Sequence, residues 1–165
     1  MDIILVRHGI AVNRSEVEND EKRWLTKEGK LKTVRAAQGL GALGVRPDLI
    51  CSSPLTRAMQ TAEIISQVLS SFIPLSTTSA LAPRGTPEQI IRWLSHRTEK
   101  CIMLVSHMPN VAEAASVFCT DSHDLNILFK KAAACRCSFA GKPARAEARL
   151  DWLLQPKQLR QLASR

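Results

Sequence analysis

The sequence predicts an α/β fold, a three-layer sandwich in which helices cover both faces of a mainly parallel central sheet. Three short apolar runs, at residues 3–6, 48–52 and 101–105, show the continuous hydrophobicity of strands that are buried on both faces. Helix-like segments alternate with these runs over the first two thirds of the chain. That alternation is typical of parallel sheets with helical crossovers.

The elements follow from local signals along the chain. The first strand ends at Arg7-His8-Gly9, and the polar residues 10–25 are expected to form a loop. Thr26 is a suitable N-cap for a helix over residues 27–43, which Gly44 and Pro47 end. After the second strand, Ser53-Pro54 opens a helix that ends near residue 70.

The second half of the chain contains two more predicted helices and a set of short strands. Thr86-Pro87-Glu88 predicts a helix start with proline at the first helical position, and residues 111–118 form a helix after the third strand. Three later segments are predicted as strands: 125–129, 133–139 and 147–154. We therefore expect one domain over residues 1–155, followed by a polar, basic tail over residues 156–165.

Composition narrows the function classes. The net charge is +8, and residues 130–165 contribute most of it, with nine Lys or Arg against two acids. With aromatic residues at only 4% and no arginine-rich block, we expect no nucleic-acid partner. No apolar run approaches the roughly 20 residues that cross a bilayer, and no secretory leader is evident. We expect a cytoplasmic, monomeric protein that does not bind membranes.

The cysteines predict neither disulfides nor a metal site. Their number, five, is odd, and no two pairs have the spacing of a zinc site. We expect buried thiols, with no metal and no cofactor.

Four polar residues are expected to meet at one edge of the sheet, because parallel α/β sheets bind ligands at the carboxyl ends of their strands. Arg7 and His8 end the first strand, His107 follows the third, and Arg57 lies at the start of the helix after the second. Arginines can pair with phosphate oxygens, and a neutral imidazole can attack phosphorus. We predict His8 as a covalent nucleophile, with Arg7, Arg57 and His107 stabilising the phosphoryl group.

The order of motifs resembles the histidine phosphatase superfamily. Arg7-His8-Gly9 is similar to its signature tripeptide, and residues 25–29 (LTKEG) resemble its Leu-Thr-x-x-Gly helix opening. Residues 52–62 (SSPLTRAMQTA) match its second-arginine motif, and Ser106-His107 its second histidine. The resemblance implies a phosphoglycerate mutase-like fold and a metal-free phosphatase. Within the family, the short chain and Met108-Pro109 are closest to SixA-type phosphohistidine phosphatases.

One departure from mutase-like relatives bears on the substrate. Residues 81–85 (LAPRG) contain no acid where such relatives carry a catalytic glutamate. An ester releases a basic alkoxide that needs a proton, whereas a protonated imidazole leaves without much help. The missing acid therefore favours phosphohistidine or phosphoramidate substrates, and the resemblance implies a phosphohistidine carried by another protein. Two alternatives stay open: a phosphatase for small phosphate esters, with Glu88 or Glu16 as the acid, and a phosphate-binding module without turnover.

Two further residues are candidate substrate contacts. Gly9 is expected to leave space for phosphate beside the backbone. Arg84 either contacts the substrate or is a solvated loop charge.

Overall fold

The computed structural model describes residues 1–70 and 72–164 of the chain. In these residues six strands form one sheet in the order β3-β2-β4-β1-β5-β6. The strands β1 to β4 run parallel, whereas β5 is antiparallel to both β1 and β6. The predicted α/β class and mainly parallel sheet are confirmed. The strand bounds are β1 (Asp2–Arg7), β2 (Leu49–Ser52), β3 (Leu75–Thr77), β4 (Cys101–Ser106), β5 (Ala134–Phe139) and β6 (Ala148–Leu154).

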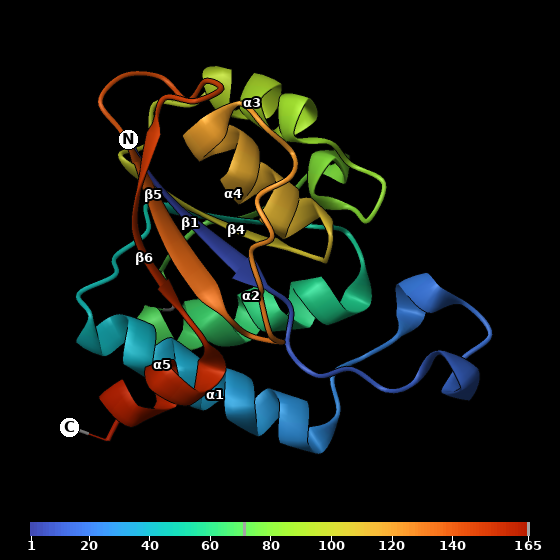
Figure 1. The fold of residues 1–165 in the computed structure, drawn as a ribbon. Coiled ribbons are helices and arrows are strands. Elements are labelled where there is room, and N and C mark those ends of the chain that lie inside the picture. Colours follow the sequence, from blue (N-terminus) through green and yellow to red (C-terminus); the bar gives the residue numbers. More distant parts are fainter. Residues whose placement is uncertain (71, 165) are drawn as a thin grey trace.

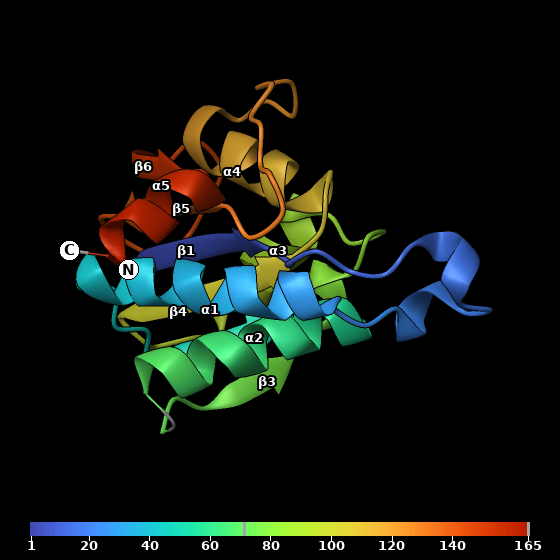
Figure 2. The same ribbon diagram turned by 90° about the horizontal axis from the view of Figure 1, so that it is seen from below.

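Helices cover both faces of the sheet (Figure 1). One face carries α1 (Lys27–Ala42), α2 (Thr56–Leu69) and α5 (Pro156–Leu162), as the view from below shows (Figure 2). The other face carries α3 (Pro87–Ser95) and α4 (Asn110–Thr120).

Each face has its own aliphatic core, because neighbouring side chains of a strand point to opposite faces. Ile4 and Val6 of β1 pack in the cluster that contains α1, α2 and α5. Ile3 and Leu5 belong to the cluster of α3 and α4. All four side chains are buried, as expected of a strand that lies inside the sheet between β4 and β5.

Residues 10–25 connect β1 to α1 as a loop, as predicted, and two short 3-10 helices lie within it, at Arg14–Glu16 and Asp20–Lys22. An isolated bridge between Ala11 and Leu25 closes the base of the loop. Beyond that base the loop projects past the carboxyl end of β1 (Figure 2). The short β3 was not anticipated from the sequence.

The prediction of a strand at residues 125–129 is wrong, because this segment contains no strand. Strand β1 is already hydrogen-bonded by β4 on one side and by β5 on the other, so it offers no free edge. The segment instead passes the carboxyl end of β1, where the buried Phe129 packs in the core of the α3–α4 face.

The expected polar tail also differs from the structure. Pro156–Leu162 form α5, which starts with a reciprocal capping box between Gln155 and Gln158. The Leu159 side chain is completely buried against α1. A Cβ at Gly39 of α1 would lie 2.0 Å from the Leu159 carbonyl oxygen, so glycine permits this close approach. The terminal segment therefore contributes to the core.

None of the helices in the described residues combines the length and the hydropathy needed to cross a membrane.

Candidate active site

The parallel pairing of β1 with β4 brings the two predicted histidines together. Arg7 lies opposite Ser106, and the His8 amide donates to the Ser106 carbonyl oxygen at 3.0 Å. The two imidazole rings, each almost fully buried, have centroids 4.9 Å apart and are tilted by 55°. The edge of the sheet thus places His8 beside His107.

The His8 ring is oriented by its own backbone. Its Nδ1 lies 2.7 Å from the Gly9 carbonyl oxygen. Because a carbonyl can only accept, Nδ1 carries the proton and Nε2 keeps its lone pair. The Gly9 amide in turn donates to Thr61 Oγ1 at 3.0 Å, and Thr61 Oγ1 donates to the Arg57 carbonyl oxygen. Helix α2 therefore holds Gly9 through Thr61, and the Gly9 carbonyl oxygen in turn orients the His8 ring.

Gly9 also has a packing role that was not predicted from the sequence. A Cβ at this position would lie 2.5 Å from Thr33 Oγ1 and 3.3 Å from Leu25. The missing side chain therefore lets β1 approach α1 closely. Its polar groups bond to Thr61 and to His8 rather than lying free for a substrate.

His107 is held from the other side. Its Nε2 lies 2.8 Å from Ser53 Oγ, which follows β2. Its Nδ1 is buried and, among the described residues, has no hydrogen-bond partner. Buried polar nitrogens are rarely left unsatisfied, so this atom is a candidate contact for a bound group.

The two predicted arginines differ in their partners. Arg7 Nη1 donates to the Phe129 carbonyl oxygen at 2.6 Å, while its buried Nε has no partner in the described residues. Arg57, almost fully buried, donates through Nη1 to the Asp20 carbonyl oxygen at 2.8 Å and through Nη2 to the Asp20 carboxylate at 3.1 Å. The loop after β1 thus reaches back and supplies a counter-charge to Arg57.

Burial and surrounding cations keep both histidines neutral. Burial, the charge of Lys131 and the neighbouring His107 lower the pKa of His8 to about 2. Burial and then the charge of Arg57 lower the pKa of His107 to about 3. An uncharged imidazole with a free Nε2 is the form in which histidine acts as a nucleophile.

The two carboxylates considered from the sequence, Glu88 and Glu16, each have partners of their own. Glu88 is exposed and pairs with Arg145 and His123, and its own backbone amide is the largest cause that holds its pKa below the usual value. Glu16 accepts a hydrogen bond from the Asn13 amide within its loop.

Asp20 is the carboxylate that touches a predicted site residue, Arg57. Partial burial opposes its ionisation, but hydrogen bonds from Arg23 and Arg57 and their charges outweigh burial and lower its pKa.

Arg84 is exposed, with no hydrogen bond or ion pair to another described residue. Within residues 1–70 and 72–164, no three His, Cys, Asp or Glu side chains are grouped as metal ligands usually are.

Three contributing residues were not singled out from the sequence: Ser53, Thr61 and Asp20. Ser53 and Thr61 lie within the motif at residues 52–62, and Thr61 is one helical turn after Arg57, a spacing that places both on one face of α2. Asp20 gave no such signal, because its contact with Arg57 spans 37 positions of the chain.

Comparison with known proteins agrees with this geometry. The sequence model of the histidine phosphatase superfamily (branch 1) matches residues 3–85, which include Arg7, His8 and Arg57. The chain belongs to this superfamily. An uncharacterized protein from Picosynechococcus sp. is 34% identical over 164 residues, which cover 96% of this chain and 99% of that protein.

Solved structures of the superfamily share the fold over nearly the whole chain. The protein histidine phosphatase SixA, solved in complex with tungstate, gives a TM-score of 0.86 at 22% identity and covers 96% of this chain and 99% of its own. A candidate alpha-ribazole-5'-P phosphatase from Escherichia coli K-12 gives 0.75 at 16% identity, with coverage of 93% and 95%. At these identities the likeness establishes the fold.

Proposed function

We propose that this protein is a phosphatase that carries the phosphoryl group on His8 and removes it from phosphohistidine on another protein. The observation that carries the proposal is the orientation of His8. Its Nδ1 donates to the Gly9 carbonyl oxygen, so that Nε2 is the free nucleophile, and the Nδ1 of the neighbouring His107 has no hydrogen-bond partner in the described part of the chain.

The reaction proceeds in two displacements. First, His8 Nε2 attacks phosphorus while the bond from phosphorus to the substrate nitrogen breaks and its electron pair returns to the leaving imidazole. Water then attacks phosphorus, the bond to His8 breaks with its electron pair returning to Nε2, and the protons of the water leave with the released phosphate. In both steps Arg7 and Arg57 donate hydrogen bonds to the phosphoryl oxygens, and the His107 Nδ1–H donates another.

The charge states of Glu88 and Asp20 favour a substrate whose leaving group is a nitrogen. Glu88 is engaged in surface ion pairs, and Asp20 is ionised between Arg23 and Arg57. A phosphate ester needs a proton donor for its departing alkoxide, whereas a protonated imidazole does not. The fold shared with SixA is consistent with this substrate class.

One observation favours a second candidate, a phosphatase for small esters. The Asp20 carboxylate lies 3.1 Å from the Arg57 guanidinium, so it is close to where a phosphate would bind. A bound dianion would raise the pKa of Asp20 and could convert it into the proton donor that an ester requires.

The test compares phosphate release from a phosphohistidine-bearing protein domain and from an aryl phosphate ester. The matched variant is His8→Asn, because an asparagine amide can still donate to the Gly9 carbonyl oxygen while Nε2 is removed. We expect fast release from phosphohistidine, slow release from the ester, and loss of both in the variant. Fast ester turnover that disappears in Asp20→Asn would instead support the ester phosphatase.

Trapping the intermediate separates an enzyme from a binding module. A rapid acid-free quench should reveal a label on His8 that is stable in alkali and labile in acid, as a phosphorus–nitrogen bond is. If the protein binds phosphate but shows neither this label nor turnover, it is a phosphate-binding module and not a phosphatase.

A further inference from the structure

The segment from Phe129 to Ala133 forms a wall beside the nucleophile. At one end, the Phe129 carbonyl oxygen accepts from Arg7 Nη1 at 2.6 Å. At the other, the Ala132 amide donates to the carbonyl oxygens of Arg7 and His8, at 3.0 and 3.2 Å, and the Arg7 amide donates to the Ala133 carbonyl oxygen at 3.0 Å. The backbone of Lys131, between these anchors, is thereby fixed to the end of β1.

A sharp change of direction follows Lys131. Ala132 has a φ of +65°, in the left-handed region that a residue with a Cβ seldom adopts. Such strain persists only where the surroundings impose it, and here the paired hydrogen bonds to Arg7 and His8 do so. The turn sets where the Lys131 side chain leaves the backbone.

The Lys131 ammonium lies among cations. Burial first, and then the charges of the surrounding arginines, lower its pKa to about 8, while the carboxylate of Asp20 opposes the shift. Its own charge is in turn the second-largest cause, after burial, of the low pKa of His8. The arginines concerned are Arg7, Arg23 and Arg57.

Lys131 has no carboxylate partner in the described part of the chain, neither by hydrogen bond nor by ion pair, although it is partly buried. Asp20 is the nearby acid, and its oxygens are engaged by Arg23 and Arg57. A partly desolvated cation beside three others is unfavourable in the free protein, and a dianion bound between them would remove that cost.

We propose that Lys131 is a further phosphate-binding residue, whose ammonium donates to an oxygen of the phosphoryl group on the substrate and on His8. This assignment rests on the proposed function, since it needs phosphate to bind beside His8. Lys131 adds a point charge to the directed hydrogen bonds of the arginines. Its backbone lies between Phe129 and Ala132, whose hydrogen bonds to Arg7 and His8 hold this segment beside the nucleophile.

The test measures binding of inorganic phosphate by calorimetry in three proteins: wild type, Lys131→Met and Lys130→Met. Lys130 is the adjacent, exposed lysine, so its variant makes the same change in total charge away from the site. We expect Lys131→Met to weaken phosphate binding about tenfold or more, as the loss of a charge-assisted hydrogen bond does. Lys130→Met should stay within about twofold, as expected of a screened surface charge.

Melting curves distinguish a loss of phosphate binding from a loss of folding. Because no described carboxylate pairs with Lys131, Lys131→Met should melt at the same temperature as wild type or higher. If it unfolds instead, Lys131→Gln gives the same comparison with a polar side chain. Equal phosphate affinity in a folded neutral variant and in Lys130→Met overturns the assignment.

A pH series adds a second readout. The ratio of the wild-type affinity to the Lys131→Met affinity should fall as the pH rises above about 8, because free Lys131 then loses its proton. A ratio that stays constant up to pH 10 contradicts a charged Lys131 contact. The other titratable groups facing the site, Arg7, Arg57, Asp20, His8 and His107, keep their charge states in this range, and they are the same in both proteins.

The outcomes separate this inference from the function on which it rests. If wild type neither binds phosphate nor shows turnover that depends on His8, the proposed function and the Lys131 assignment both fail. If wild type does both and Lys131→Met behaves like Lys130→Met, only the Lys131 assignment fails.

Discussion

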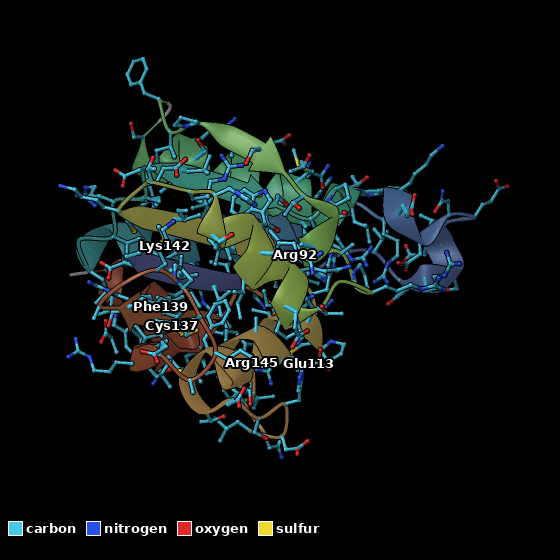
Figure 3. All side chains as sticks on the ribbon, turned by 90° about the horizontal axis from the view of Figure 1, so that it is seen from above. Arg92, Glu113, Cys137, Phe139, Lys142 and Arg145 are labelled. Atoms are coloured by element: carbon cyan, nitrogen blue, oxygen red, sulfur yellow. The ribbon has the colours of Figure 1, made fainter. Side chains whose placement is uncertain are left out.

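The cations at the carboxyl end of the sheet differ in their partners from two arginines elsewhere on the molecule, Arg136 and Arg145. Arg136 of β5 pairs with Asp2 and Asp151. Arg145, which is labelled in Figure 3, pairs with Glu88 of α3 and with Asp121, which follows α4. At the site, by contrast, Arg7 bonds to a neutral carbonyl oxygen and Lys131 has no described acidic partner.

Arg57 is intermediate between the two groups, because Asp20 from the projecting loop supplies its only described counter-charge. Positive charge at the strand ends is therefore left incompletely neutralised among the described residues, whereas Arg136 and Arg145 are each balanced by two acids. Such an excess of positive charge, partly desolvated, suits a ligand with two negative charges. Each prediction below tests one side of this contrast.

The largest expected effect is on Arg7. Arg7→Met removes a guanidinium that stabilises the phosphoryl oxygens, so kcat/KM should fall about 10³-fold, the scale of losing one such donor. The free protein should stay folded, because no described acid is left unpaired. Steady-state kinetics and a melting curve on the same sample provide the check. A variant with near-normal turnover would remove Arg7 from the phosphate site.

The buried histidines should make stability depend on pH. The folded pKa of His107, about 3, is below its unfolded value of 6.5, so its stabilising contribution is complete above pH 6.5 and is lost as the pH falls. The loss is at most about 1.4 kcal/mol per pH unit, or about 3 kcal/mol by about pH 4.5.

Denaturant titrations of wild type and His107→Gln at several pH values measure this contribution. The variant should lose less stability than wild type between pH 6.5 and about 4.5, because it lacks one of the groups that must protonate on unfolding. Parallel loss in both proteins would mean that His107 is not held neutral. Carboxylates contribute equally to both and cancel in the comparison.

The parts that the sequence predicts best are those determined by local patterns. Continuous apolar runs identified β1, β2 and β4, and caps and prolines located four helices within a few residues. Because parallel strands end at one edge, the convergence of His8, Arg57 and His107 followed from the order of elements alone.

The parts it did not predict depend on distant contacts. Residues 125–129 have the composition of a strand, but β1 had no free edge for them. The terminal residues appear polar, yet one buried leucine, Leu159, and a close contact with Gly39 hold them as a helix. Asp20 and Lys131 reach the site through loops, and no periodic signal encodes such contacts.

Asp20→Asn removes the one described counter-charge of Arg57, and its expected effect on phosphate binding is smaller. The asparagine keeps an oxygen that can accept from Arg57 Nη2 but removes a negative charge near the expected phosphate. We expect inorganic phosphate to bind up to about tenfold more tightly, because like-charge repulsion at the site is relieved. Calorimetry measures the change, with Glu21→Gln on the same loop as a control. Weaker binding in Asp20→Asn would show that the carboxylate mainly positions Arg57.

The smallest effect is expected where charge is balanced. Arg136→Met breaks ion pairs with Asp2 and Asp151 at a partly exposed position of β5, so the free energy of unfolding should fall by about 1 kcal/mol or less. Turnover should be unchanged, because Arg136 pairs across the sheet with Asp2 of β1 and Asp151 of β6 and bonds to none of the site residues. Together with Arg7→Met, it gives opposite patterns: one variant loses activity at constant stability, the other a little stability at constant activity. If Arg136→Met lowered turnover as strongly as Arg7→Met, then net charge, and not charge left unpaired at the strand ends, would explain catalysis.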